Sequence, residues 1–139
     1  MDNNRALNYL ALGKKGRLIE LGEEPVGAVA RAVKARLVVV ASDASDHTWR
    51  RAKSFVAGTE QQCIRVPFTK EELGFVVGRT SLAIAAFTDA ALALAFVKAL
   101  PDPEKFKDTI EKLDIKAKKL RQRRDEAKAH QRNIRTGKK

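Results

Sequence analysis

The apolar run at residues 37–41, Leu-Val-Val-Val-Ala, constrains the fold more than any other feature of the sequence. Five residues are too few for a helix, and three consecutive valines favour a strand buried on both faces. The run ends at Ser42, Asp43 and Ser45, residue types that cap the start of a helix. A strand buried on both faces needs helices above and below its sheet, so the run predicts an α/β protein.

Helical and strand patterns alternate along the first hundred residues. Helices are predicted over residues 4–12, 23–34, 46–57, 70–77 and 90–100, and strands over residues 17–21, 37–41, 63–66 and 82–87. The second helix carries an apolar stripe of Val26, Val29, Ala30 and Val33. Thr69 and Glu72 form a capping box at the start of the fourth helix. This order predicts a three-layer α/β/α sandwich with a mixed four-stranded sheet.

Two prolines, Pro101 and Pro103, divide the chain into a predicted domain of residues 1–100 and a tail of residues 101–139. The tail has an apolar seam with 4-3-4-3 spacing, formed by Phe106, Ile110, Leu113, Ala117 and Leu120. This spacing predicts an amphipathic C-terminal basic helix with a heptad-like face. Its last ten or so residues have little apolar surface to bury, so we expect them to be disordered when unbound.

The basic charge is concentrated in the tail. The whole chain carries 28 Lys plus Arg against 17 Asp plus Glu, a net charge of +11. Residues 1–103 hold 14 basic and 11 acidic side chains, whereas residues 104–139 hold 14 and 6. A nearly neutral domain with a strongly basic tail indicates a polyanionic partner, either nucleic acid or an anionic membrane surface.

No group of residues in the sequence suits catalysis or cofactor binding. His47 and His130 lie far apart, and no Cys or His pair has the spacing of metal ligands. Cys63 begins a predicted strand, where a thiol is expected to be an inert apolar group. Gly74 and Gly78 are expected to serve close helix packing and a helix end. The sequence therefore predicts a protein that is not an enzyme, with no cofactor, no metal and no small-molecule substrate.

A cytoplasmic location is expected from the cysteine content and the apolar segments. The single cysteine excludes an internal disulfide and fits a reducing compartment. The longest apolar stretch, residues 81–95, is interrupted by Thr88 and Asp89 and is too short to span a membrane. The N-terminus lacks the apolar core of a signal peptide.

Six short segments, in this order and at these separations, resemble a known family. They are residues 6–18, 21–26, 35–45, 66–78, 78–80 and 87–89. The chain resembles the L-seven-Ae / L-thirty-e family of ribosomal, kink-turn RNA-binding proteins, in its short bacterial branch, over about residues 4–98. The resemblance implies an α/β/α fold and a partner that is ribosomal or other structured RNA, with the ribosome itself a possible partner.

The resemblance also implies where RNA would bind. In the family, RNA lies between two turns that correspond to residues 22–28 and 79–81. Glycine allows close backbone approach there, and a helix N-terminus presents free amides. Adding the basic clusters gives a predicted RNA-binding set of Lys14, Lys15, Arg17, Gly22, Glu23, Glu24, Lys70, Arg79, Thr80, Lys116, Lys118, Lys119, Arg121, Arg123 and Arg124.

At three positions the sequence departs from the family pattern. Where kink-turn-binding members have Asn, Glu and Lys, this chain has Glu24, Pro25 and Ala28. We therefore expect RNA binding on the same face with weak discrimination of kink-turns. Three alternatives stay open: a protein interaction module that uses the 106–120 seam, a substrate-binding partner of an RNA-modifying enzyme, and, with less support, a membrane-surface role for the tail.

Overall fold

The computed structural model describes residues 3–135 of the chain. Within them the strands are β1 (Ile19–Leu21), β2 (Leu37–Val40), β3 (Gln62–Arg65) and β4 (Ile84–Phe87). The helices are α1 (Asn3–Lys15), α2 (Glu23–Arg31), α3 (Asp46–Val56), α4 (Lys70–Val76), α5 (Ala90–Lys98) and α6 (Lys107–Arg135), with a 3-10 helix, η1 (Pro103–Phe106), before α6. Each predicted helix and strand is present, with shifted limits.

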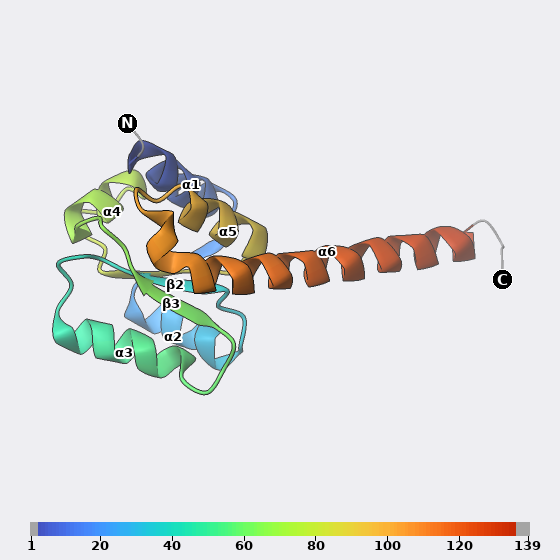
Figure 1. The fold of residues 1–139 in the computed structure, drawn as a ribbon, viewed down its shortest axis with the longest axis horizontal. Coiled ribbons are helices and arrows are strands. Elements are labelled where there is room, and N and C mark those ends of the chain that lie inside the picture. Colours follow the sequence, from blue (N-terminus) through green and yellow to red (C-terminus); the bar gives the residue numbers. More distant parts are fainter. Residues whose placement is uncertain (1–2, 136–139) are drawn as a thin grey trace.

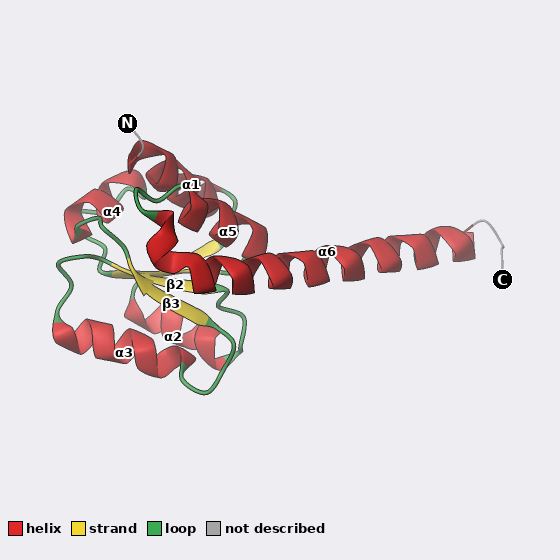
Figure 2. Cartoon of the chain, viewed as in Figure 1, coloured by secondary structure: helices red, strands yellow, loops and turns green. Residues whose placement is uncertain are grey.

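The four strands form one mixed sheet in the order β1-β4-β2-β3. β2 and β3 are parallel, whereas β4 is antiparallel to both of its neighbours, β1 and β2. Helices α1, α4 and α5 cover one face of the sheet, and α2 and α3 cover the other (Figures 1 and 2). The predicted α/β/α sandwich with a mixed four-stranded sheet and a C-terminal helix is confirmed.

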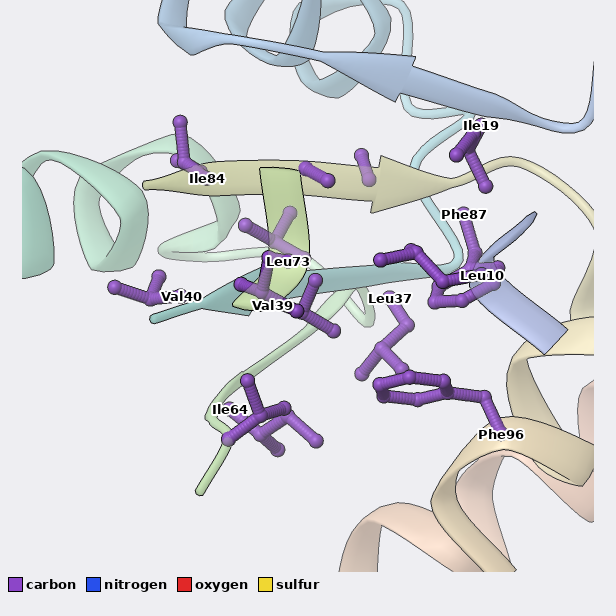
Figure 3. Close-up of a cluster of buried hydrophobic side chains, with 14 of the residues drawn as sticks. Leu10, Ile19, Leu37, Val39, Val40, Ile64, Leu73, Ile84, Phe87 and Phe96 are labelled. Carbon is purple, nitrogen blue, oxygen red and sulfur yellow. The ribbon is translucent and has the colours of Figure 1, made fainter. Parts of the chain in front are cut away.

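The core lies on both faces of the two central strands. All four residues of β2 and all four of β4 are buried, as the run of β-branched and small residues requires. Leu37, Phe87 and Phe96 belong to the apolar cluster drawn in Figure 3, and the rings of Phe87 and Phe96 lie 4.9 Å apart between centroids. β2 is therefore the central strand that its sequence predicts.

The polar residues that follow β2 cap two different helices. The Ser45 hydroxyl accepts a hydrogen bond from the Thr48 amide at the start of α3. The carboxylate of Asp43 accepts one from the amide of Lys70, the first residue of α4. The predicted capping box of Thr69 is also present. These caps fix both helices at the carboxyl end of the parallel strands.

Helix α6 begins against the domain and then leaves it. Leu113 is 2% exposed and belongs to the core cluster, Ala117 is buried, and Phe106 and Ile110 pack against that cluster. Thr109 also donates a hydrogen bond to the Gln62 side chain at the edge of the sheet. The seam thus packs on its own domain as far as Ala117, so this part is not available to pair with another helix.

Beyond Leu120 the helix projects away from the domain as an extended rod (Figure 1). Residues 121–132 are exposed along its whole circumference. The structure describes the chain as helix through Arg135, and residues 136–139 lie outside the described part. Disorder of the last ten or so residues when unbound stays a prediction.

One predicted stripe is partly wrong. Val26 and Ala30 are buried as expected, but α2 ends at Arg31 and Val33 is 55% exposed. The amides of Val33 and Lys34 turn back to the carbonyls of Ala30 and Val29, which ends the helix and points Val33 outward. An apolar stripe can continue in sequence past the point where the backbone leaves the helix.

Candidate nucleic-acid interface

The strand register gives the sheet two ends that carry different groups of predicted site residues. Ile19, Leu37, Gln62 and Phe87 pair across one end, from which α6 departs, and we call it the tail end. Leu21, Val40, Arg65 and Ile84 mark the other, which we call the turn end. The strands of three or four residues between them are roughly 10 Å long.

At the turn end, Gly22 joins β1 to α2. Its backbone has φ 95° and ψ 161°, a region that is open almost only to glycine. The Gly22 amide donates to the Ile84 carbonyl at 3.0 Å, and its own carbonyl accepts from the Val26 amide. The turn is therefore held on both sides, with the first residues of α2 presented at the surface.

The loop after α4 is fixed equally closely. Arg79 donates its amide to the Gly74 carbonyl at 2.8 Å, and Gly78, with φ 76°, donates to Phe75; this is a Schellman helix end. A Cβ at Gly74 would come within 2.8 Å of the backbone of Arg79 and Ser81. The expected close packing at Gly74 is confirmed, although its partner is this loop and not a second helix.

These two turns meet in space although they are far apart in the chain. The Arg79 guanidinium lies 3.7 Å from the position that a Cβ on Gly22 would occupy. Arg79 and Thr80 are exposed beside the first turn of α2, and Lys70 is tied to the same region because its carbonyl accepts from the Leu82 amide. The structure thus brings Gly22 and Arg79 together.

The two glutamates of this turn are not equivalent. Glu23 forms an ion pair with Arg51 of α3, whereas the side chain of the exposed Glu24 has neither a hydrogen bond nor an ion pair among the described residues. Arg51 is absent from the predicted set because nothing local in the sequence links it to Glu23. Carboxylates at the N-terminus of α2 compete with phosphate for the helix dipole, so base amino groups suit this turn better than phosphates.

Three further predicted residues lie at the tail end. Lys14 and Lys15 occupy the last turn of α1, not the loop in which the sequence placed them, because α1 continues to Lys15. Arg17 follows with φ 59°, and the chain then enters β1. All three side chains are exposed. They are separated from Gly22 by the length of β1.

The basic residues of the tail all lie on α6. Lys118, Lys119, Arg121, Arg123 and Arg124 are exposed, and Lys116 is partly buried. Lys118 pairs with Asp114 at 3.0 Å, a surface contact that is worth little. Lys116, Lys119 and Arg123 lie beside the loops at the tail end, so the predicted site residues divide into two groups at opposite ends of the sheet. Their role in RNA binding stays a prediction.

The groups weighed for catalysis are not arranged for it. Burial raises the pKa of the Cys63 thiol to about 12, although the nearby charge of Lys53 lowers it. The thiol is therefore protonated and weakly reactive at neutral pH. Among the described residues, no three His, Cys, Asp or Glu side chains gather as metal ligands would. Nor does the described part of the chain contain a helix long and apolar enough to cross a membrane.

Two solved structures share this fold. One, a protein of unknown function from Bacillus halodurans, has a TM-score of 0.63 and 22% identity, covering 68% of this chain and 95% of its own. The other, the Giardia lamblia 15.5kD RNA binding protein, has a TM-score of 0.60 and 17% identity, covering 78% and 89%. No protein-family model matches the sequence, and no curated protein sequence matches it. At these identities the likeness concerns the fold.

Proposed function

We propose that this chain is a non-enzymatic, cytoplasmic RNA-binding protein of the L-seven-Ae / L-thirty-e type, which binds ribosomal or other structured RNA at the turn end. The observation that carries the proposal is the meeting of Gly22 and Arg79. This meeting brings a glycine turn, a helix N-terminus and the exposed guanidinium of Arg79 to one surface. A fold shared with an RNA-binding protein supports the same function.

The chemistry of the turn end suits a nucleic acid with exposed base edges. Gly22 has no side chain, so a base can approach the backbone closely. The first amides of α2 can donate to base acceptors, and Glu24 can accept from a base amino group. Arg79 can bind a phosphate or the O6 and N7 atoms of guanine. Together these groups bind base edges and one phosphate beside them.

The tail contributes affinity without selectivity. Residues 104–139 carry 14 basic side chains, and each phosphate neutralised on a duplex adds about 0.9 to the salt dependence of log K. We propose that the turn end selects the RNA and that α6 supplies electrostatic attraction. The interaction-module alternative is less favoured, because Leu113 and Ala117 of its seam are already buried on the domain.

The test is the binding of a bulged RNA hairpin to the full chain and to Arg79→Gln. A charged contact is worth roughly 1.5–3 kcal/mol, so the variant should bind about tenfold more weakly or worse. Lys98→Gln on α5 is the matched control, since it removes one exposed cation away from the turns, and it should bind within twofold of the parent. Equal effects of the two substitutions would contradict a site at the turn end.

A further inference from the structure

A groove at the tail end lies outside the site proposed above. It runs between α6 and two segments, residues 33–36 before β2 and residues 58–62, which end in the first residue of β3, and has a volume of about 750 Å³. The groove is at the opposite end of the sheet from Gly22 and Arg79. A ligand held there does not share the turn-end contacts.

Cations dominate the polar lining of the groove. Its basic residues are Arg36, Lys112, Lys116, Lys119 and Arg123, whereas Glu60 is the one carboxylate in the described part of the lining. Lys112 also forms an exposed ion pair with Asp108 at 3.1 Å. The four basic residues on α6 are spaced 4, 3 and 4 residues apart, which places them in one row along a single helix face. At 1.5 Å per residue that row is about 16 Å long. It is an extended cationic track.

The floor of the groove is rigid. The Gln61 side chain accepts from the Ala35 amide at 2.9 Å and donates to the Ala30 carbonyl at 3.2 Å, which ties the two loops together. Leu113 anchors α6 in the core on the other side. These buried contacts hold the start of the cationic row, at Lys112 and Lys116, beside the loops.

Two features of the lining remain unexplained by packing. The Nε of Arg36 is buried and has no hydrogen-bond partner among the described residues. Val33 and Ile115 are apolar side chains left 55% and 54% exposed. A buried donor without a partner is a feature that occurs at binding sites.

We propose that this groove binds a second stretch of RNA backbone, so that one molecule holds two RNA segments at opposite ends of its sheet. The proposal rests on the RNA-binding function proposed above and adds a contact to it. Phosphates lie along Lys112, Lys116, Lys119 and Arg123, with Arg36 at the inner end. No aromatic residue lines the groove, so binding there is independent of base sequence.

A long polyanion fits better than a short acidic peptide. The cationic row passes out of the groove onto the exposed part of α6, where residues 121–132 include only Ala127 and Ala129 as apolar side chains that could anchor a peptide. Beyond Leu120 the chain has eight basic side chains and only two acidic ones. The track is open at its outer end, as an RNA strand longer than the groove requires.

The test compares two triple variants of the full chain that remove the same charge from opposite faces of α6. The groove variant carries Lys116→Gln, Lys119→Gln and Arg123→Gln. The control carries Lys118→Gln, Arg121→Gln and Arg124→Gln. Glutamine is a good helix former, so helicity by circular dichroism should match the parent in both. The probe is a twenty-nucleotide oligouridylate, which has no structure for the turn end to select.

The groove variant should bind oligouridylate at least tenfold more weakly, and its log–log salt slope should fall by about 2, at roughly 0.7 per phosphate on a single strand. The control should lose threefold or less. Equal losses in both variants would overturn the groove and leave only diffuse charge. Equally tight binding of a twenty-residue polyglutamate, with the same dependence on the groove residues, would overturn RNA as the ligand.

The same variants separate this proposal from the function proposed above. Arg79→Gln should weaken binding of the bulged hairpin while leaving oligouridylate binding dependent on the groove residues. If the hairpin effect is absent and the groove effect remains, the turn-end site is wrong and the groove stands. If only the hairpin effect is seen, the second site is wrong.

Discussion

Arg17 and Val33 both adopt the left-handed conformation that glycine normally supplies at a helix end. Their φ angles are 59° and 57°. In each case the amide of the next residue bonds back to a carbonyl five residues earlier, so α1 and α2 both end in a Schellman motif without glycine. A left-handed residue with a Cβ costs roughly 1–2 kcal/mol, so both positions hold strain.

Val33→Gly tests that strain. The substitution should raise the free energy of unfolding by about 1 kcal/mol, because relief of the strain exceeds the entropy that glycine adds to the unfolded chain. Little burial is lost, since Val33 is 55% exposed. Urea unfolding measures the change, and Val33→Ala, which keeps the Cβ, should gain less. A less stable glycine variant would show that the Val33 side chain makes a contact that matters more than its backbone.

The raised pKa of the Cys63 thiol predicts that the free energy of unfolding falls at alkaline pH. Its pKa is raised by burial to about 12, so above pH 9 the unfolded chain loses this proton more readily than the folded one. The stabilisation by the protonated thiol is present below pH 9 and is lost as the pH rises toward 12, and about 1.4 kcal/mol of it is lost by pH 10. Unfolding of the parent and of Cys63→Ala at pH 8 and pH 10 measures the loss. The difference in free energy of unfolding between the two proteins should change by that amount, and a constant difference would contradict the raised pKa.

At the scale of elements, α6 belongs partly to the domain and partly to the tail. Leu113 is buried in the core cluster, while residues 121–132 are exposed. The proline boundary after Leu100 therefore separates two segments that share one core. The 106–120 seam could be predicted from its spacing, but the same pattern serves packing on the chain's own domain or on another helix. The folded chain shows which of the two it is: η1 leads α6 back against the domain, where Leu113 enters the core.

Two truncations separate these parts of α6. Ending the chain after Leu100 removes Leu113, and since loss of one buried leucine costs roughly 2–5 kcal/mol, the product should melt at least about 10 °C lower. Ending it after Leu120 should leave the melting temperature within a few degrees. This shorter tail should still weaken RNA binding evenly across sequences and flatten its salt dependence, because eight basic residues are lost.

RNA binding by the chain that ends at Leu100 cannot be interpreted alone, because lost stability and lost charge both weaken that binding. Thermal unfolding by circular dichroism should therefore precede the RNA titrations for each product. If the chain ending at Leu120 binds as tightly as the parent at low salt, the tail has no electrostatic role. The interaction-module alternative would then gain support for the exposed half of α6.

For the whole molecule, the sequence predicts the layers well and the surfaces poorly. Strand and helix order follow from local patterns such as the valines of β2 and the Thr69 capping box, which need no distant partner. Gly22 and Arg79 were predicted together only through the family resemblance. Arg51, which pairs with Glu23, carries no local signal because α3 and α2 meet only in the folded chain.

The tail-end groove shows the same limit. Its loops and helix come from residues 33–36, 58–62 and 112–123, which no sequence pattern connects. The row of Lys112, Lys116, Lys119 and Arg123 is visible as a helical spacing, yet the sequence alone does not tell which face of α6 packs on the domain. Lys118 and Arg121 are equally basic and lie on the other side. Only the packing of α6 on the domain shows which of these basic residues line the groove.

The three positions at which the sequence departs from the family pattern bear on which RNAs the whole molecule would prefer. Glu24, Pro25 and Ala28 stand where the resemblance noted in the sequence would place Asn, Glu and Lys, and all three are exposed in the structure on or just beyond the first turn of α2. Under the proposed function, side chains at these three positions would face the bound RNA. The parent protein should therefore discriminate poorly between a kink-turn and a simple bulged hairpin of equal length.

Restoring the family residues tests this expectation. Glu24→Asn, Pro25→Glu and Ala28→Lys together should raise the preference for the kink-turn about tenfold or more, since one good base contact gives roughly 1–3 kcal/mol of discrimination. Glu24→Gln, Pro25→Ala and Ala28→Gln is the control, which changes the same positions without the family's groups. Gly22→Val should weaken hairpin binding in either background, because the glycine-only backbone and close approach at that turn are lost. Titration of the parent against matched kinked and unkinked RNAs measures its discrimination directly. Tight, selective binding of the kinked form by the parent would contradict the expectation. It would show that the fold, with Arg79 beside Gly22, recognises the kink by shape.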